Sequence, residues 1–188
     1  MRYKFHSKIL TVAILMLCVQ VVFAQKNKKT PAVAEKAYKE KDYYTAADVY
    51  RAVFSSSKNK LGGAKLAMHQ YYYAESSKKT YNFTRAQEYY GKVAKGEFEE
   101  IYPKVDYWYA YCLKHNGKYD EAIKYFKMFL DKPVKGIELT HLKLEAEHEL
   151  RGCYLAIDLV ENPDLLTKIT HMSDEVNTKY SDFSPHLV

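Results

Sequence analysis

A pattern of aromatic and small residues recurs three times along the chain. In each copy an aromatic residue is followed by two residues, an alanine, three more residues and a second aromatic residue. The copies are Tyr43–Ala46–Tyr50, Phe83–Ala86–Tyr90 and Tyr119–Ala122–Phe126, with the alanines 40 and then 36 residues apart. Because an α-helix completes a turn in 3.6 residues, this spacing predicts one face of a helix in each copy. Val53, Val93 and Phe129 extend that face by another turn.

A second helical stretch precedes each of these helices. The predicted stretches are Pro31–Glu40, Ala64–Lys79 and Pro103–His115, and Asn116-Gly117 is the turn of the third pair. A small alanine in the seam lets two helix axes approach within ~8–10 Å, while the aromatic side chains fill the remaining space. One hairpin cannot bury its apolar face alone, whereas three stacked hairpins can. The sequence therefore predicts an all-α fold of stacked helical hairpins.

One more helix is predicted after Pro133, which stops the third hairpin. Its apolar residues keep helical spacing and are Leu139, Leu142, Ala146, Leu150, Cys153, Ile157 and Val160. Glu145, Glu147 and Glu149 are expected on the solvated side, and Asn162-Pro163 ends the helix. Because a stack of repeats needs an end piece with a polar outer face, we expect this helix to cap the stack.

The third hairpin carries the small and aromatic positions of a known repeat. Residues 107–133 contain Ala110 in the first helix, Gly117 at the turn, and then Tyr119, Ala122, Phe126 and Pro133. This pattern resembles the tetratricopeptide repeat (TPR). In the first two units Lys41 and Tyr81 occupy the turn position. The family's early tryptophan is replaced by Gln70 in the second unit and by Asp106 in the third. The resemblance implies a TPR-like right-handed superhelix of about three repeats plus a capping helix, over residues 31–160.

The first 24 residues have the layout of a secretory signal peptide. Basic residues precede an apolar run from Ile9 to Val19, and small residues at Val22 and Ala24 suit a cleavage site. The run is 11 residues long, whereas a membrane-spanning helix needs roughly 20, so an uncleaved anchor is the weaker alternative. Cleavage after Ala24 leaves residues 25–30 as a linker and removes three basic residues, which lowers the formal net charge from +6 to +3. Such a charge does not favour nucleic-acid binding, and we expect an exported, periplasmic protein.

The remaining residues, 161–188, are interpreted as a short extended tail. Within it, the stretch from Val176 to Pro185 resembles the first strand of a WD40-like β-propeller. TPR repeats followed by such a propeller are similar to exported OmpA-family envelope proteins, which include components linked to the type IX secretion system. The resemblance implies that the tail is the start of a truncated propeller and that the protein is associated with the outer membrane.

Few residues suggest catalytic or metal chemistry. His141, Glu145 and His148 share a helix face, but a metal site needs further ligands, so a solvated face is the favoured interpretation. Cys112 and Cys153 lie on apolar stripes; two small core residues are favoured over a disulfide. The sequence has no phosphate-binding glycine loop and no nucleophile elbow. We therefore expect no enzymatic activity, no cofactor and no metal ion.

The remaining candidate site is a partner-binding groove. In TPR arrays the first helix of each hairpin lines the concave face, and the resemblance assigns twelve residues to that face. They are Glu35, Tyr38, Lys39, Tyr71, Glu75, Lys78, Lys79, Lys104, Tyr107, Tyr111, Lys114 and His115. Tyrosine offers rigid contact area with a polar tip, and lysine complements an acidic segment. We expect the groove to bind an extended peptide or a loop of a partner; the alternative is a solvated face with incidental tyrosines.

These observations favour a non-catalytic periplasmic TPR scaffold. Its concave face would bind envelope proteins of an outer-membrane, peptidoglycan-associated or secretion complex, with outer-membrane or peptidoglycan association being indirect. The alternative function is a glycan-binding module of an outer-membrane uptake system, since exposed aromatic side chains also stack on sugars. Salt separates the two, because screening weakens contacts made by lysine but not sugar binding. A redox or metal enzyme would require bound metal or a reactive Cys112.

Overall fold

The computed structural model describes residues 29–56, 61–133 and 136–163. The predicted signal peptide, most of the linker and the tail from residue 164 onward lie outside the described residues. Within the described ranges the chain forms seven α-helices and no strand, which confirms the all-α prediction. The helices are α2 (Pro31–Lys39), α3 (Tyr43–Ser55), α4 (Gly63–Lys79), α5 (Phe83–Ala94), α6 (Val105–His115), α7 (Tyr119–Asp131) and α8 (Ile137–Glu161).

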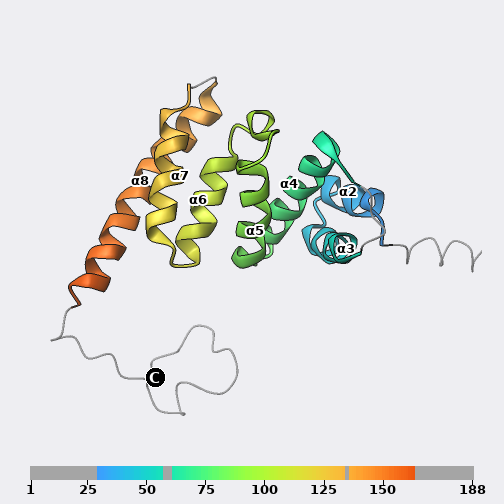
Figure 1. The fold of residues 1–188 in the computed structure, drawn as a ribbon, viewed down its shortest axis with the longest axis horizontal. Helices are drawn as coiled ribbons and strands as arrows, with labels where there is room; N and C mark the ends of the chain where they lie inside the picture. The colour runs from blue at the N-terminus through green and yellow to red at the C-terminus, as the bar shows by residue number, and fades with distance from the viewer. Residues whose placement is uncertain (1–28, 57–60, 134–135, 164–188) are drawn as a thin grey trace, which may run out of the picture.

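The helices pair into three hairpins, as the sequence pattern predicts, and the hairpins follow one another along the array (Figure 1). Local sequence explains where several helices begin. The side chains of Thr30, Asp42 and Asn82 accept hydrogen bonds from backbone amides three residues later, at the starts of α2, α3 and α5. The helix α6 begins later than predicted, because Pro103 and Lys104 form a turn after a short 3-10 helix, Glu99–Ile101.

The turns inside the three hairpins share one backbone geometry. Lys41, Tyr81 and Gly117 have positive φ angles of 62°, 60° and 74°. In each turn the amide of this residue bonds to the carbonyl three residues earlier, and the next amide bonds to the carbonyl five residues earlier. This is the Schellman motif that ends many helices. The three turn positions are therefore structurally equivalent, although only one of them carries glycine.

The predicted seam lies at the centre of the hairpins. Ala46, Ala86 and Ala122 are completely buried, and so are the aromatic residues that follow them, Tyr50, Tyr90 and Phe126. Val53, Val93 and Phe129 are also buried. The aromatic residues that begin each pattern, Tyr43, Phe83 and Tyr119, are only half-buried because they lie in the first turn of each second helix.

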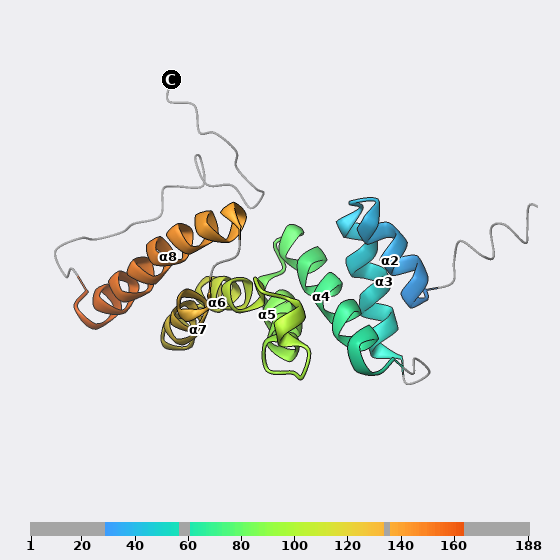
Figure 2. The same cartoon turned by 90° about the horizontal axis from the view of Figure 1, so that it is seen from above.

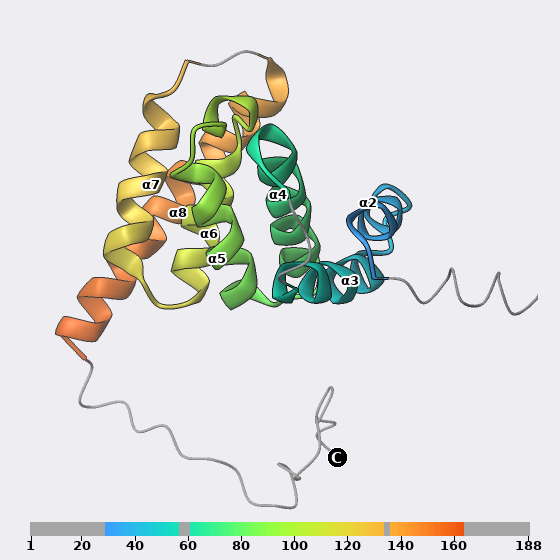
Figure 3. The same cartoon turned by 45° about the vertical axis from the view of Figure 1, so that its right-hand side comes forward.

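Each helix packs mainly against the helices that precede and follow it in the chain. Further contacts join α2 to α4 and α6 to α8. Figure 2 shows α4, α6 and α8 bordering one side of the array, with α5 and α7 on the other side. We call the side formed by α2, α4, α6 and α8 the inner face. Figure 3 shows α3 running across the end of α4, so the first hairpin is turned relative to the later helices. None of the described helices is both long enough and apolar enough to cross a membrane.

The prediction that α8 presents a polar outer face is wrong. Glu145 and Glu147 are exposed as expected, but Ile137, Leu144, Leu155 and Leu159 are also more than half exposed. Val160, predicted to belong to the core, is 72% exposed because the last turns of α8 extend beyond the end of α7 (Figure 1). The prediction that the other side of α8 packs into the core is confirmed, because Leu142, Ala146 and Cys153 are buried.

Candidate interaction surface

The predicted groove residues lie on α2, α4, α6 and the turn before α6. Three are exposed, seven are half-buried and two are buried. The exposed ones are Lys39, Lys79 and His115; the half-buried ones are Glu35, Tyr38, Tyr71, Glu75, Lys104, Tyr111 and Lys114; the buried ones are Lys78 and Tyr107. The structure thus brings this set to the helices of the inner face, but it leaves Lys78 and Tyr107 with little exposed surface.

Lys78 is held inside the protein by an acid and an aromatic ring. Its ammonium lies 2.8 Å from Glu75 Oε1 and 3.0 Å from the centre of the Trp108 ring, and only 8% of its surface is exposed. The hydroxyl of Tyr90 donates to the same Glu75 oxygen. Desolvation lowers the pKa of Lys78, while the attraction of Glu75 opposes that change. Lys78 on α4 therefore contacts Trp108 on α6. Helical spacing alone could not predict this contact.

The other lysines of the predicted groove, except Lys79, are also paired with glutamates. Lys39 bonds to Glu35 at 2.6 Å on α2, Lys104 bonds to Glu138, and Lys114 bonds to Glu149 at 2.6 Å. The last two pairs connect α6 with α8, so Glu149 is half-buried rather than fully solvated. These pairs neutralise most of the positive charge that was expected to attract an acidic segment.

Aromatic side chains make up much of the inner face. Tyr38 stacks on Tyr72 with ring centres 4.1 Å apart, and Tyr71 stacks on Tyr102 at 4.6 Å. Trp108 and Tyr111 meet edge to face at 5.8 Å on α6. Because the rings come from α2, α4, α6 and the segment before α6, they form a surface shared by all three hairpins rather than a feature of one.

A cavity of about 400 Å³ lies between α6 and α8 on this face. It is lined by Tyr107, Trp108, Tyr111, Glu145, His148 and Glu149. The hydroxyl of Tyr107 donates to Glu145 Oε2 at 3.2 Å, and Glu145 has no ion-pair partner among the described residues. The aromatic side chains can stack on a ligand. The histidine and the carboxylates can accept hydrogen bonds from it.

Four residues of this cavity were missing from the predicted groove, namely Trp108, Glu145, His148 and Glu149. Glu145, His148 and Glu149 lie on α8, which was predicted to be a cap and was therefore not placed on the inner face. Trp108 lies on α6, where the assigned positions did not include it. The repeat spacing carried a signal for the α8 residues, because Tyr107 and Glu145 are 38 residues apart and the seam alanines are 36 to 40 apart. α8 thus occupies the position of a further first helix.

Cys112 and Cys153 are buried and unpaired, which confirms the interpretation as core residues. Burial raises the pKa of the Cys112 thiol to about 12 and that of Cys153 to about 11. Both side chains are therefore protonated near neutral pH, and a protonated thiol is a poor nucleophile. The described residues also contain no cluster of three or more side chains suited to a metal ion, and His141 and His148 are exposed.

No protein-family model matches this sequence, and a search of the curated proteins finds no match. The function is therefore inferred from the chemistry of the surface itself.

Proposed function

We propose that this protein is a non-catalytic periplasmic scaffold whose hairpins form a TPR-like right-handed superhelix. Its inner face would hold segments of envelope proteins in an outer-membrane, peptidoglycan-associated or secretion complex. The observation that supports this proposal is the three pairs of aromatic side chains on α2, α4, α6 and the segment before α6, the last of which lines the cavity between α6 and α8. Large rigid side chains with polar tips are the residues that protein interfaces favour.

The chemistry of recognition differs from the lysine-based attraction that the sequence suggested. Four groove lysines are engaged by Glu35, Glu75, Glu138 and Glu149. A partner would therefore be held mainly by stacking against Tyr111 and Trp108 and by hydrogen bonds to Glu145 and His148. Binding of this kind depends only weakly on salt, because few free charges contribute to it.

The proposed location rests on the sequence of residues 1–24, which have the basic start, short apolar run and small residues of a signal peptide. If the signal peptide is removed as proposed, N-terminal sequencing of the protein isolated from its own cell will begin at Gln25. A protein that begins at Met1 and fractionates with membranes would instead support the uncleaved anchor.

Site-directed photo-cross-linking in the native cell tests the docking role. A photoreactive residue at His148, which lines the inner cavity, is expected to give defined cross-links to one or a few envelope proteins. The matched control places the same residue at Lys127, which is exposed on α7 on the other side of the array. Tyr111→Ala should abolish the cross-links from position 148 without lowering the melting temperature by more than a few degrees. The same products from both positions, or none from position 148, would refute the proposal.

A glycan-binding module remains the second candidate, because Trp108, Tyr111, Glu145 and His148 meet in one cavity. An aromatic ring beside carboxylate and imidazole acceptors is suited to a sugar face and its hydroxyl groups. Quenching of the single tryptophan by soluble oligosaccharides, lost in Glu145→Gln, would favour this function over protein docking.

A further inference from the structure

A second cavity, of about 290 Å³, lies where the last turns of α4 meet α3 and the start of α5. It is lined by Tyr44, Ala47, Asp48, Arg51, Tyr73, Ser77, Thr80, Asn82 and Arg85. None of these residues belongs to the surface discussed above. The proposed docking role neither requires nor explains this cavity.

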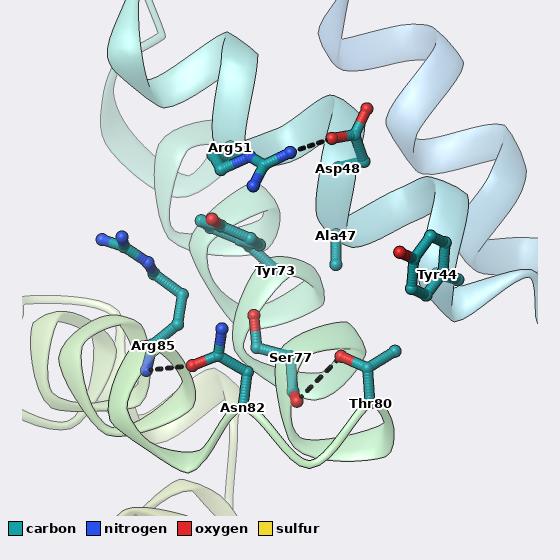
Figure 4. A pocket seen from close by; sticks show the side chains of 9 residues that line it. All are labelled: Tyr44, Ala47, Asp48, Arg51, Tyr73, Ser77, Thr80, Asn82 and Arg85. Atoms are coloured by element: carbon teal, nitrogen blue, oxygen red, sulfur yellow. Dashed lines mark hydrogen bonds and ion pairs between the residues drawn. The ribbon is translucent and has the colours of Figure 1, made fainter. Parts of the chain in front are cut away.

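Two side-chain hydrogen-bond donors face this cavity (Figure 4), and neither has a partner in the part of the chain that the structure describes. Ser77 is 1% exposed, and its hydroxyl has no hydrogen-bond partner among the described residues. The side-chain oxygen of Asn82 accepts from the amide of Arg85 at 3.1 Å, which leaves the amide nitrogen of Asn82 free to donate. Figure 4 shows the Ser77 hydroxyl and the Asn82 amide nitrogen directed toward the same space, which Tyr44, Asp48 and Arg51 border from α3. A ligand that accepts hydrogen bonds from the Ser77 hydroxyl and the Asn82 amide would be stabilising here.

Two arginines also line this cavity. Arg51 and Arg85 line the cavity from α3 and α5, and both act on the Tyr73 hydroxyl, whose pKa they lower against the rise that burial causes. Arg51 is paired with Asp48, and Arg85 with Glu88 at 2.6 Å.

Asp48 and Glu88 each form a second ion pair, with a lysine. Asp48 binds Lys29 at 2.7 Å, and Glu88 binds Lys92 at 2.8 Å. Together with Arg51 and Arg85, the group has four basic and two acidic side chains, so a positive charge of two remains.

The start of α5 adds to the same effect. Asn82 is the N-cap of this 12-residue helix, and the positive end of the helix dipole therefore adjoins the cavity. Guanidinium groups form paired hydrogen bonds with the oxygens of carboxylates and phosphates, which a single ammonium cannot do.

We propose that this cavity binds an oxyanion, the carboxylate or phosphate group of a partner molecule. Arg51 and Arg85 supply the charge, and the buried Ser77 hydroxyl and the Asn82 amide donate hydrogen bonds to the anion. The cavity is open to solvent on the α3 side, where Tyr44 is 80% exposed, so an anionic group on a larger molecule can enter.

Titration of the full mature chain with small anions tests this site. Amide NMR shifts are followed with inorganic phosphate and with acetate as separate probes, at constant ionic strength set with sodium chloride. The expected result is saturable shifts at Ser77, Asn82 and the first turn of α5 for at least one probe. Arg85→Gln and Ser77→Ala should each weaken binding by about tenfold, as expected for loss of a hydrogen bond to a charged ligand. Tighter binding of phosphate would identify a phosphorylated ligand, and tighter binding of acetate an acidic side chain or chain terminus.

Arg151→Gln on α8 is the matched control, because Arg151 is exposed and lies on a helix that does not line the cavity. It should leave the affinity unchanged. Thermal melts measure whether Ser77→Ala lowers the stability of the protein. If it does, the affinity of Arg51→Gln is compared with that of the unchanged protein instead, because Arg51 is exposed. The absence of saturable shifts with both probes would overturn the proposal. Equal weakening by Arg85→Gln and Arg151→Gln would also overturn it, because binding would then reflect net charge alone.

Discussion

Lys78, His69 and Asp106 are ionisable side chains that the fold buries almost completely. Each is compensated differently. Lys78 has Glu75 and the Trp108 ring, and His69 Nδ1 lies 3.0 Å from the Tyr50 hydroxyl. Among the described residues, Asp106 forms an ion pair only with the ammonium of Lys132, which it shares with Glu99. Because a buried charge without its partner is strongly destabilising, Lys132 is the residue on which the Asp106 carboxylate depends.

Lys132→Met should therefore destabilise the protein by about 3 kcal/mol at pH 7.5. Burial raises the pKa of Asp106 from 3.8 to about 6, so the folded state holds that proton more tightly than the unfolded state. This contribution favours folding at acid pH and disappears as the pH rises through about 6. The cost of Lys132→Met should accordingly be much smaller at pH 4.5. Urea unfolding at both pH values measures the difference.

Lys92→Met provides the matched comparison for Lys132→Met. Lys92 pairs with Glu88, and both side chains are more than 40% exposed, so the cost should stay below about 1 kcal/mol at either pH. Equal costs of Lys132→Met at pH 4.5 and 7.5 would show that Asp106 does not depend on this lysine.

At the scale of the helical hairpin, the turn geometry is more uniform than the sequence. Lys41, Tyr81 and Gly117 all adopt the left-handed conformation that ends α2, α4 and α6. A residue with a Cβ atom is strained there, whereas glycine is not. Lys41 and Tyr81 therefore lower the stability of the fold, because each hairpin requires the left-handed conformation at its turn.

Tyr81→Gly should stabilise the protein by roughly 0.5–1 kcal/mol, because relief of strain outweighs the larger entropy of the unfolded chain. Gly117→Ala should have the opposite effect, of about 1 kcal/mol. Apart from the adjoining residues of the chain, no described atom lies within 4 Å of the added methyl group, so this cost comes from the backbone conformation. Denaturant titrations of both variants measure these effects.

Lys124→Gly separates the effect of backbone conformation from the effect of glycine itself. Lys124 is exposed in the middle of α7, where glycine should cost about 1 kcal/mol. If Tyr81→Gly destabilises the protein as much as Lys124→Gly does, the proposed strain at residue 81 is absent.

At the scale of the whole molecule, stability is distributed along a row of helices. The main contacts join helices that are adjacent or one apart in the chain, and the seam continues from α2 to α8. In such an array a local defect weakens its neighbours more than distant units. The exposed apolar residues of α8 also show that the row does not end in a polar surface within the described residues.

Phe126→Ala should cost about 3–5 kcal/mol, because the side chain is completely buried between α6 and α7. Hydrogen exchange followed by mass spectrometry should show protection lost in α6, α7 and α8 and largely kept in α2 and α3. Met128→Ala, at an exposed position of α7, should change little. An unchanged melting curve for Phe126→Ala, or equal loss of protection in every helix, would contradict this picture of the array.

Much of the fold could be predicted from local patterns. The spacing of Ala46, Ala86 and Ala122 identified the buried seam, and Asn116-Gly117 identified one of three equivalent turns. The predicted bounds of α2, α4 and α6 agree with the structure within two residues, and α8 ends where Asn162-Pro163 predicted. No bounds were predicted for α3 and α5, and no start for α8. These features depend on residues close in sequence, whose spacing on a helix is set by backbone geometry.

The surfaces available to a ligand could not be predicted in this way. Whether Lys78 faces solvent depends on Trp108, which lies on another hairpin, and Glu145 meets Tyr107 across 38 residues of sequence. Arg51, Ser77 and Arg85 likewise come from three helices. The sequence by itself determined which residues form helices and which side of each helix is buried, because a repeating local pattern encodes both. The tertiary structure alone decided which charges are neutralised and which donors remain unpaired, because these depend on how helices distant in sequence are packed.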